Sequence, residues 1–101
     1  MLKIILCCSA AMSSSLLVEK MKVEAHHLGI DADILSMPMK DLDNHIHADI
    51  ILLAPQVKYA LKDIEKMFPS IPVIEVSVKE YGLMDGKHVL DNALKKLHII
   101  A

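Results

Sequence analysis

The feature that most constrains the fold of this chain is a regular alternation of short apolar runs with longer amphipathic stretches. The run Leu2–Cys7 is almost unbroken, as is typical of a central parallel strand buried on both faces. Further strands are predicted at Ala32–Met37, Asp49–Leu53 and Val73–Val76. Strands that alternate with helices favour a parallel sheet. We therefore expect an α/β fold in one domain, residues 1–101: an open four-stranded parallel sheet with helices on both faces.

The helical stretches have apolar residues three or four positions apart, with charged residues between them. One helix is predicted over Leu17–Leu28, one over Val57–Phe68 and one over Val89–Leu97. The polar segment Lys40–His47 favours a short helix or a turn, and Asp85-Gly86 favours a turn. Together these elements predict the order βαβαβαβα.

Composition excludes several classes of protein. With 53% hydrophobic residues the chain has enough apolar side chains for a core, which argues against disorder. A formal net charge of -2 and only 3% aromatic residues argue against a nucleic-acid partner, which would need positive charge and stacking side chains. No apolar run approaches the roughly 20 residues of a membrane span. The N-terminal run is too short for a signal peptide, and two adjacent cysteines cannot form a disulfide framework. We expect a cytoplasmic protein.

The segment that follows the first predicted strand carries the candidate chemistry. Cys8 is followed by small and hydroxyl residues as far as Ser15, and then by a helix. Ligands of open parallel sheets bind beyond the carboxyl ends of the strands, near the topological switch point. Small side chains let backbone amides converge on an anion, and the helix N-terminus adds positive potential. Both effects favour a Cys8 thiolate, so this residue is predicted to be a nucleophile that holds a phosphoryl group.

A purely structural interpretation of the same loop also stands. Buried cysteines at strand ends are commonly small core residues, and serines before a helix are commonly caps. Ser13, Ser14 and Ser15 therefore either donate hydroxyl hydrogen bonds or cap the helix. Cys7 continues the apolar strand, so a packing role is predicted for it.

The chain contains no arginine, and this absence bears on the reaction. Cysteine-dependent phosphatases with this type of loop follow the cysteine with five residues and then an arginine, which binds the phosphoryl oxygens in the transition state. The sixth residue after Cys8 is Ser14. Efficient hydrolysis is therefore not expected, and the loop is better suited to a phosphoryl carrier.

The segment Leu6–Leu17 resembles a known phosphocysteine loop, that of the IIB component of the lactose/cellobiose-type phosphoenolpyruvate-dependent sugar phosphotransferase system. The family pattern is close to C-S-A-G-M-S-[ST]-S-L-L, and this chain has Ala11 at the glycine. Similarity continues at Leu53–Val57, Tyr59 and Tyr81–Gly86, so that it spans essentially the whole chain. The resemblance implies a fold like that of the low-molecular-weight tyrosine phosphatases.

The resemblance also implies a function. Cys8 would accept a phosphoryl group from a histidine of the IIA partner and pass it to a sugar bound by the membrane-embedded IIC permease. A β-linked disaccharide such as cellobiose, chitobiose or lactose is the expected sugar. No cofactor is implied, and the protein would reach the membrane only through IIC.

The same resemblance implies roles for the surrounding residues. Pro55, Gln56 and Tyr59 would lie beside the phosphoryl-binding loop. Independently of the resemblance, Met12 is expected either to contact the partner proteins or to pack at the start of the helix. The loop that would hold the phosphoryl group comprises Ser9, Ala10, Ala11, Met12, Ser13, Ser14 and Ser15.

Other functions remain as alternatives at this stage. A phosphatase-like or an arsenate-reductase-like thiol enzyme would use the same cysteine, although adjacent cysteines form only a strained disulfide. A flavodoxin-like or receiver-like binding module would need aromatic or acidic residues that the strand ends lack. The pairs His26-His27 and His45-His47 are incomplete as metal ligand sets, so no metal site is predicted.

Overall fold

The described part of the chain forms one sheet of four parallel strands. A computed structural model describes residues 1–9, 11–43 and 45–100, with the backbone alone described for residues 11–14. The strand order is β2-β1-β3-β4, which confirms the expected open parallel sheet, and each strand ends within one residue of its prediction. The strands are β1 (Leu2–Cys8), β2 (Ala32–Pro38), β3 (Ile50–Leu53) and β4 (Val73–Glu75).

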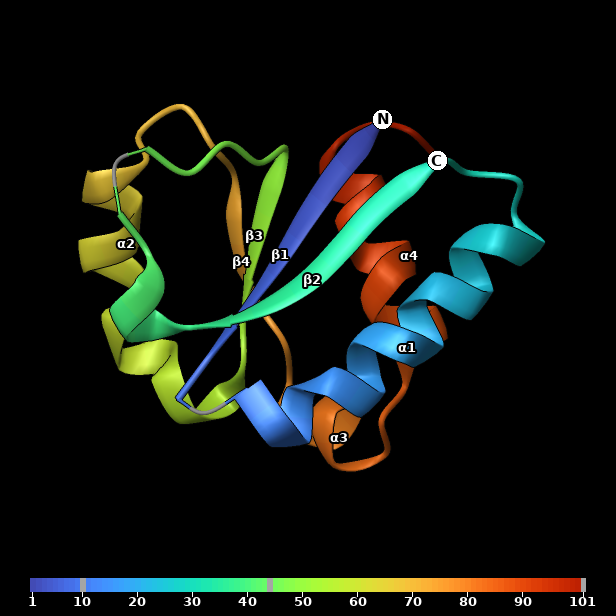
Figure 1. Cartoon of the computed structure of the whole chain (residues 1–101), viewed down its shortest axis with the longest axis horizontal. Coiled ribbons are helices and arrows are strands. Elements are labelled where there is room, and N and C mark those ends of the chain that lie inside the picture. Colours follow the sequence, from blue (N-terminus) through green and yellow to red (C-terminus); the bar gives the residue numbers. More distant parts are fainter. Residues whose placement is uncertain (10, 44, 101) are drawn as a thin grey trace.

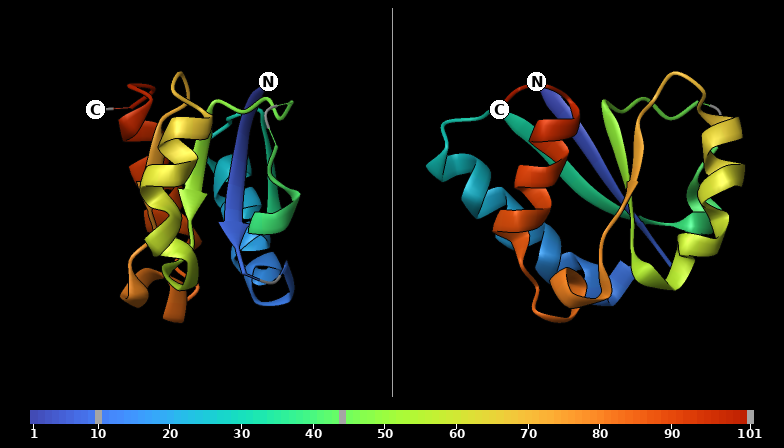
Figure 2. Two further views of the ribbon diagram at one scale, coloured as in Figure 1. Left: turned by 90° about the vertical axis from the view of Figure 1, so that its left-hand side faces the viewer. Right: turned by 180° about the vertical axis from the view of Figure 1, so that it is seen from behind.

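Helices cover both faces of the sheet, as the alternation predicts (Figure 1). Two long helices, α1 and α4, pack against each other on one face, and α2 lies on the other face (Figure 2). Three shorter helical segments, α3 and the 3-10 helices η1 and η2, complete the connections. The bounds are α1 (Ala11–His27), η1 (Met39–Asp41), η2 (Pro55–Ala60), α2 (Leu61–Met67), α3 (Val78–Gly82) and α4 (Gly86–Lys96).

The core is built on the two central strands. β1 and β3 pair with each other and are flanked by β2 and β4, so both of their edges are paired, and helices cover both faces of the sheet. Full burial of one aliphatic side chain contributes about 1.5–3 kcal/mol, which explains why these strands are apolar without alternation. The fully buried aliphatic side chains of these strands are Ile4, Ile5, Leu6, Ile50, Ile51, Leu52 and Leu53.

The start of α1 differs from the sequence prediction. The helix begins at Ala11, so Ser13, Ser14 and Ser15 lie in its first two turns and the prediction that they cap it is wrong. Alanine and methionine are better helix formers than serine, which favours a start before the serine run. Ala11, which stands in place of the family glycine, is the first residue of α1, a helical position that alanine favours.

The segment after β4 contains a helix that the periodicity does not predict. α3 is a single turn, too short for its apolar residues to repeat. Its start is nevertheless encoded, because Ser77 and Glu80 form a capping box in which each side chain bonds the backbone N–H of the other. The polar segment between β2 and β3 forms the 3-10 turn η1, in agreement with the prediction of a short helix or turn.

A close contact between α1 and α4 depends on a glycine. Gly86 is the first residue of α4, and a Cβ atom placed on it would lie 2.7 Å from the backbone carbon of Lys20 and from the backbone nitrogen of Met21. Contacts this short with backbone atoms force the two helices apart. Glycine is therefore required here by packing rather than by its conformational freedom.

Replacing Gly86 with alanine is expected to destabilise the fold by about 2 kcal/mol, because the added methyl group overpacks the contact between α1 and α4. Gly82→Ala is the matched control, since no atom lies within 4 Å of a Cβ atom at that helical glycine. It should change stability by less than about 1 kcal/mol. Urea denaturation of both variants measures the difference, and equal midpoints would contradict the packing argument.

Candidate functional site

The carboxyl ends of β1 and β3 define the candidate site. The chain passes from β1 to β2 on one side and then crosses to β3 on the other side, so β1 and β3 flank the topological switch point. Cys8 is the last residue of β1 and is paired in register with Pro38 of β2. A side chain at this position lies where open parallel sheets bind ligands.

The sulfur of Cys8 is covered in this structure. Its side chain is 1% exposed, and the Sγ atom donates a hydrogen bond to the backbone oxygen of Met37 in β2 at 3.7 Å. A thiol is a weak donor, and a thiolate has no proton to donate. The contact with Met37 therefore belongs to the thiol form of Cys8.

Cys7 lies in a different environment from its neighbour. Successive side chains of a strand point to opposite faces, so Cys7 and Cys8 lie on opposite sides of the sheet. Cys7 is fully buried, and neither cysteine forms a disulfide. Burial, with a smaller effect of charge on Cys8, raises the pKa of the Cys7 thiol to about 11. Cys7 is thus a neutral core residue at physiological pH, as its place in the strand predicts.

The predicted phosphoryl-binding loop is shorter than the sequence indicates. Only Ser9 and Ala10 separate Cys8 from α1, and Ala10 lies outside the described residues, as do the side chains of residues 11–14. Met12, Ser13 and Ser14 are therefore placed by their backbone only, in the first turn and a half of α1. The first amides of a helix have no intrahelical acceptor, and α1 is 17 residues long. Its N-terminal amides thus begin three residues after Cys8.

The end of β3 lies directly beside the end of β1. The Ala54 N–H donates to the backbone oxygen of Cys7 at 2.9 Å, and η2 starts at the next residue, Pro55. Pro55 and Gln56 therefore follow the strand end next to that of β1. Tyr59 is 74% exposed, so its ring is available to a partner. Their functional roles stay predictions.

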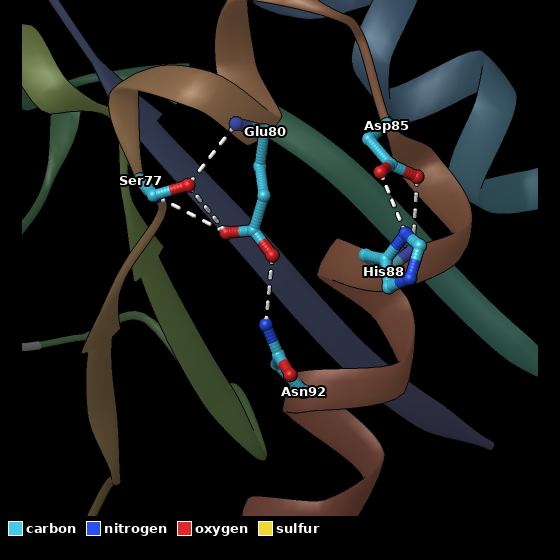
Figure 3. Close-up of polar contacts among 5 residues, drawn as sticks. All are labelled: Ser77, Glu80, Asp85, His88 and Asn92. Atoms are coloured by element: carbon cyan, nitrogen blue, oxygen red, sulfur yellow. Dashed lines mark hydrogen bonds and ion pairs between the residues drawn. The ribbon is translucent and has the colours of Figure 1, made fainter.

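The sequence analysis did not identify a polar network at the end of β4 (Figure 3). Glu80 accepts hydrogen bonds from the Ser77 N–H at 3.2 Å and from Asn92 Nδ2 in α4 at 2.9 Å. This network joins α3 to α4 and fixes the turn that follows β4. The spacing of Ser77 and Glu80 was a signal for the capping box, whereas the contribution of Asn92 depends on tertiary contact.

A second polar pair caps α4 (Figure 3). Asp85 accepts the His88 N–H at 3.2 Å, and its other oxygen lies 2.6 Å from His88 Nδ1. The backbone hydrogen bond from His88 is the main cause that lowers the pKa of Asp85. An ionised carboxylate at a helix N-terminus also interacts favourably with the helix dipole.

Other parts of the described structure supply no alternative centre. A cleft of about 720 Å³ lies at the opposite end of the strands, near the amino ends of β1 and β3, and is lined by Lys3, Asp49 and Ser70 among others. Residues 1–9, 11–43 and 45–100 contain no cluster of three potential metal ligands. Over the same residues no helix is both long and apolar enough to cross a membrane.

The fold and the site define a class of protein: an open parallel α/β domain with a thiol at the topological switch point, directly before a helix. The model of the lactose/cellobiose-specific IIB subunit family of the phosphotransferase system matches residues 3–92 of this chain. The chain therefore belongs to this family, whose members are phosphotransferase components of sugar uptake systems.

Individual relatives agree with this assignment. An oligo-beta-mannoside-specific EIIB component of Bacillus subtilis is 36% identical over 97 residues, which cover 93% of this chain and 94% of the relative. Galactose-specific and cellobiose-specific EIIB components of Lactococcus lactis are each 35% identical, with 86% of this chain and 88% of each relative covered.

Solved structures show the same fold. The cellobiose-specific IIB component of Borrelia burgdorferi has a TM-score of 0.78 at 31% identity, over 96% of this chain and 92% of that one. The lactose-specific IIB domain of Streptococcus pneumoniae has a TM-score of 0.81 at 20% identity, over 93% of this chain and 95% of that one. The resemblance of the fold to this family is therefore confirmed.

The raised pKa of Cys7 predicts a loss of stability in alkaline solution. Between pH 9 and 11 the unfolded chain releases the Cys7 proton while the folded chain retains it, so the free energy of unfolding falls with pH. Two pKa units correspond to about 3 kcal/mol, whereas below pH 9 both states hold the proton and Cys7 contributes no slope. Denaturant unfolding at about pH 8 and about pH 10.5 should show about 2 kcal/mol of this loss, because the second pH lies below the pKa of Cys7 in the folded chain.

Cys7→Ala provides the control for this prediction. The variant is less stable near neutral pH because it leaves a small cavity, but its loss of stability between the two pH values should be smaller than that of the unmodified chain. Groups that titrate in both proteins contribute equally to the two losses of stability, so the difference between the losses reports on Cys7. Equal losses in the two proteins would show that Cys7 does not hold its proton as described.

Proposed function

We propose that Cys8 is the phosphoryl-carrying residue of this IIB component. In this proposal it accepts a phosphoryl group from a phosphohistidine of a IIA partner and passes it to a sugar bound by the IIC permease. The observation that carries the proposal is the position of Cys8 at the end of the central strand, at the switch point and three residues before α1. Membership of the IIB family supports the same role.

Two displacement steps complete the proposed reaction. In the first, the Cys8 thiolate attacks the phosphorus of the phosphohistidine, the S–P bond forms, the N–P bond breaks and the imidazole takes up a proton. In the second, a sugar hydroxyl attacks the same phosphorus, the O–P bond forms and the S–P bond breaks. The hydroxyl proton is released, and the thiolate is restored for another cycle.

The backbone that follows Cys8 is proposed to hold the phosphoryl group between these steps. Ser9 and the first residues of α1 would direct their amides at the phosphoryl oxygens, as helix N-termini do for anions. Ser13, Ser14 and Ser15 would then act from within the first turns of α1 rather than from a loop. Pro55, Gln56 and Tyr59 would border the site and contact the partners.

The absence of arginine fits a carrier better than a hydrolase. Backbone amides stabilise the phosphoryl group once it is bound, whereas a guanidinium group in this type of loop stabilises the charge that develops in the transition state of hydrolysis. The chain has no arginine to supply it. A thiol redox enzyme is less well supported, since Cys7 and Cys8 lie on opposite faces of the strand and adjacent cysteines form only a strained disulfide.

The sugar and the location follow from the same proposal. The relatives are named for oligo-beta-mannosides, galactose and cellobiose. We propose a β-linked disaccharide such as cellobiose, chitobiose or lactose, which would be bound by IIC and not by this chain. The protein would act in the cytoplasm and associate with the membrane through IIC.

Intact mass spectrometry after incubation with a phosphorylated IIA protein tests the carrier role. The wild-type chain should gain the mass of one phosphoryl group, and acid should remove it because thiophosphates on cysteine are labile. Cys8→Ser should gain no such group, since a serine hydroxyl remains protonated and is a poor nucleophile at neutral pH.

Cys7→Ala is the matched variant, because it removes the neighbouring thiol and leaves the proposed nucleophile in place. It should be phosphorylated to the same extent as the wild-type chain. A wild-type chain without an adduct, or an adduct that persists in Cys8→Ser, would refute the carrier role of Cys8. An effect of Cys7→Ala equal to that of Cys8→Ser would favour chemistry at both thiols.

A further inference from the structure

Lys58 is the single charged residue in the two connections that follow the central strands. Residues 9–18, which follow β1, contain no charged side chain, and residues 54–61, which follow β3, contain only Lys58. The side chains of Lys58 and of its neighbour Tyr59 are both exposed. These two connections therefore supply one cation and no carboxylate to the end of the sheet that holds Cys8.

The helix η2 brings Lys58 close to Cys8. The Ala54 N–H donates to the Cys7 oxygen at 2.9 Å, and η2 lies against the end of β1 (Figures 1 and 2). From about 4.8 Å between neighbouring strands and a rise of about 2 Å per residue in a 3-10 helix, the Cα atoms of Lys58 and Cys8 are roughly 10 Å apart. A lysine ammonium on its four-carbon stem and a phosphoryl group on the cysteine sulfur together span this separation.

Lys58 has no carboxylate partner in the described part of the chain. The ion pairs of that part join other residues. The next carboxylate along the chain, Asp63 in the first turn of α2, takes part in none of them either. On the opposite side of β1, η1 carries both Lys40 and Asp41, so the charges of that connection balance. The charge of Lys58 is thus not neutralised by a contact within these residues.

The carboxylate of Glu75, at the end of β4, does not oppose Lys58 at the site. Glu75 pairs in register with Leu53, which pairs in register with Cys7. Residues in register point to the same face of a sheet, and successive residues of a strand point to opposite faces. Glu75 therefore shares the face of Cys7, whereas Cys8 points to the other face.

We propose that the Lys58 ammonium binds the phosphoryl group on Cys8, in the place of the arginine that this chain lacks. This inference rests on the proposed function of Cys8. A phosphoryl group carries close to two negative charges at pH 7, so a nearby cation stabilises it. An ammonium is a point charge, whereas a guanidinium group forks onto two oxygens. Lys58 therefore holds the bound phosphoryl group without the bidentate geometry that arginine supplies for hydrolysis.

The second pKa of the phosphoryl group on Cys8 tests this contact, and phosphorus NMR of the phosphorylated chain measures it. Lys58→Gln should raise this pKa by about 0.5, because loss of the cation disfavours the dianion and an exposed ion pair has a modest effect. Lys58→Arg should keep the wild-type value, since it retains the charge. In about 1 M salt, where the Debye length is about 3 Å, the difference between wild type and Lys58→Gln should largely disappear.

The equilibrium of transfer from the phosphorylated IIA protein to Cys8 provides a second measurement. A change of about 0.5 in pKa corresponds to about threefold in an equilibrium constant. Lys58→Gln should therefore lower the equilibrium constant for transfer about threefold at a pH where the wild-type phosphoryl group is a dianion. Lys58→Arg should restore it, which a merely structural role of the lysine stem would not require.

Two other lysines provide matched controls. Lys66→Gln removes a charge in the last turn of α2, far along the chain from η2, and should leave the pKa of the phosphoryl group within about 0.2. Lys40→Gln removes the cation of η1 and should have a smaller effect than Lys58→Gln, since Asp41 offsets its charge. Circular dichroism of every variant confirms that the fold is retained.

The possible outcomes separate this inference from the proposed function. An unchanged pKa in Lys58→Gln, or a larger shift in Lys40→Gln, would overturn the role of Lys58 while the phosphorylated wild-type chain still supports Cys8 as the carrier. If the wild-type chain acquires no phosphoryl group on Cys8, the proposed function itself fails, and the inference about Lys58 fails with it.

Discussion

The pairing of β1 on both of its edges is the constraint on which the rest of the structure depends. β2 pairs with β1 along seven residues and β3 pairs along four, so every backbone group in the centre of the sheet has its partner supplied by a neighbour. Both faces of the strand are covered as well, which explains its unbroken apolar sequence. The register of β1 is therefore set by its neighbours on both sides, and this register also sets the position of its last residue, Cys8.

The geometry of β1 also gives its two cysteines, Cys7 and Cys8, different surroundings. Alternation along β1 turns Cys7 into the core, where burial raises the pKa of its thiol to about 11, and leaves Cys8 at the end of the sheet beside α1. A shift of one residue in the register would exchange their surroundings. The identity of the proposed nucleophile is thus decided by pairing between strands, and not by any property of the cysteine itself.

Sequence alone predicted the strands and the long helices, because periodicity and burial on both faces leave a direct pattern in the residues. It also placed Cys8 at the end of the first strand, while the place of Pro55 and Gln56 beside it came from the family resemblance. It missed α3, a single turn without periodicity, and the link from Glu80 to Asn92, which joins residues 12 positions apart. It also placed the start of α1 too late, because serines both cap and enter helices.

The hydrogen bond from Cys8 to the Met37 carbonyl has a consequence for the dynamics of turnover. β1 holds the Cα and Cβ atoms of Cys8, so the sulfur moves only by rotation about one bond, χ1. The contact between the Cys8 sulfur and the Met37 oxygen is thus made or broken by rotation about χ1 alone. In the proposed cycle, releasing the thiol from Met37 therefore requires a change of one torsion angle and no movement of β1.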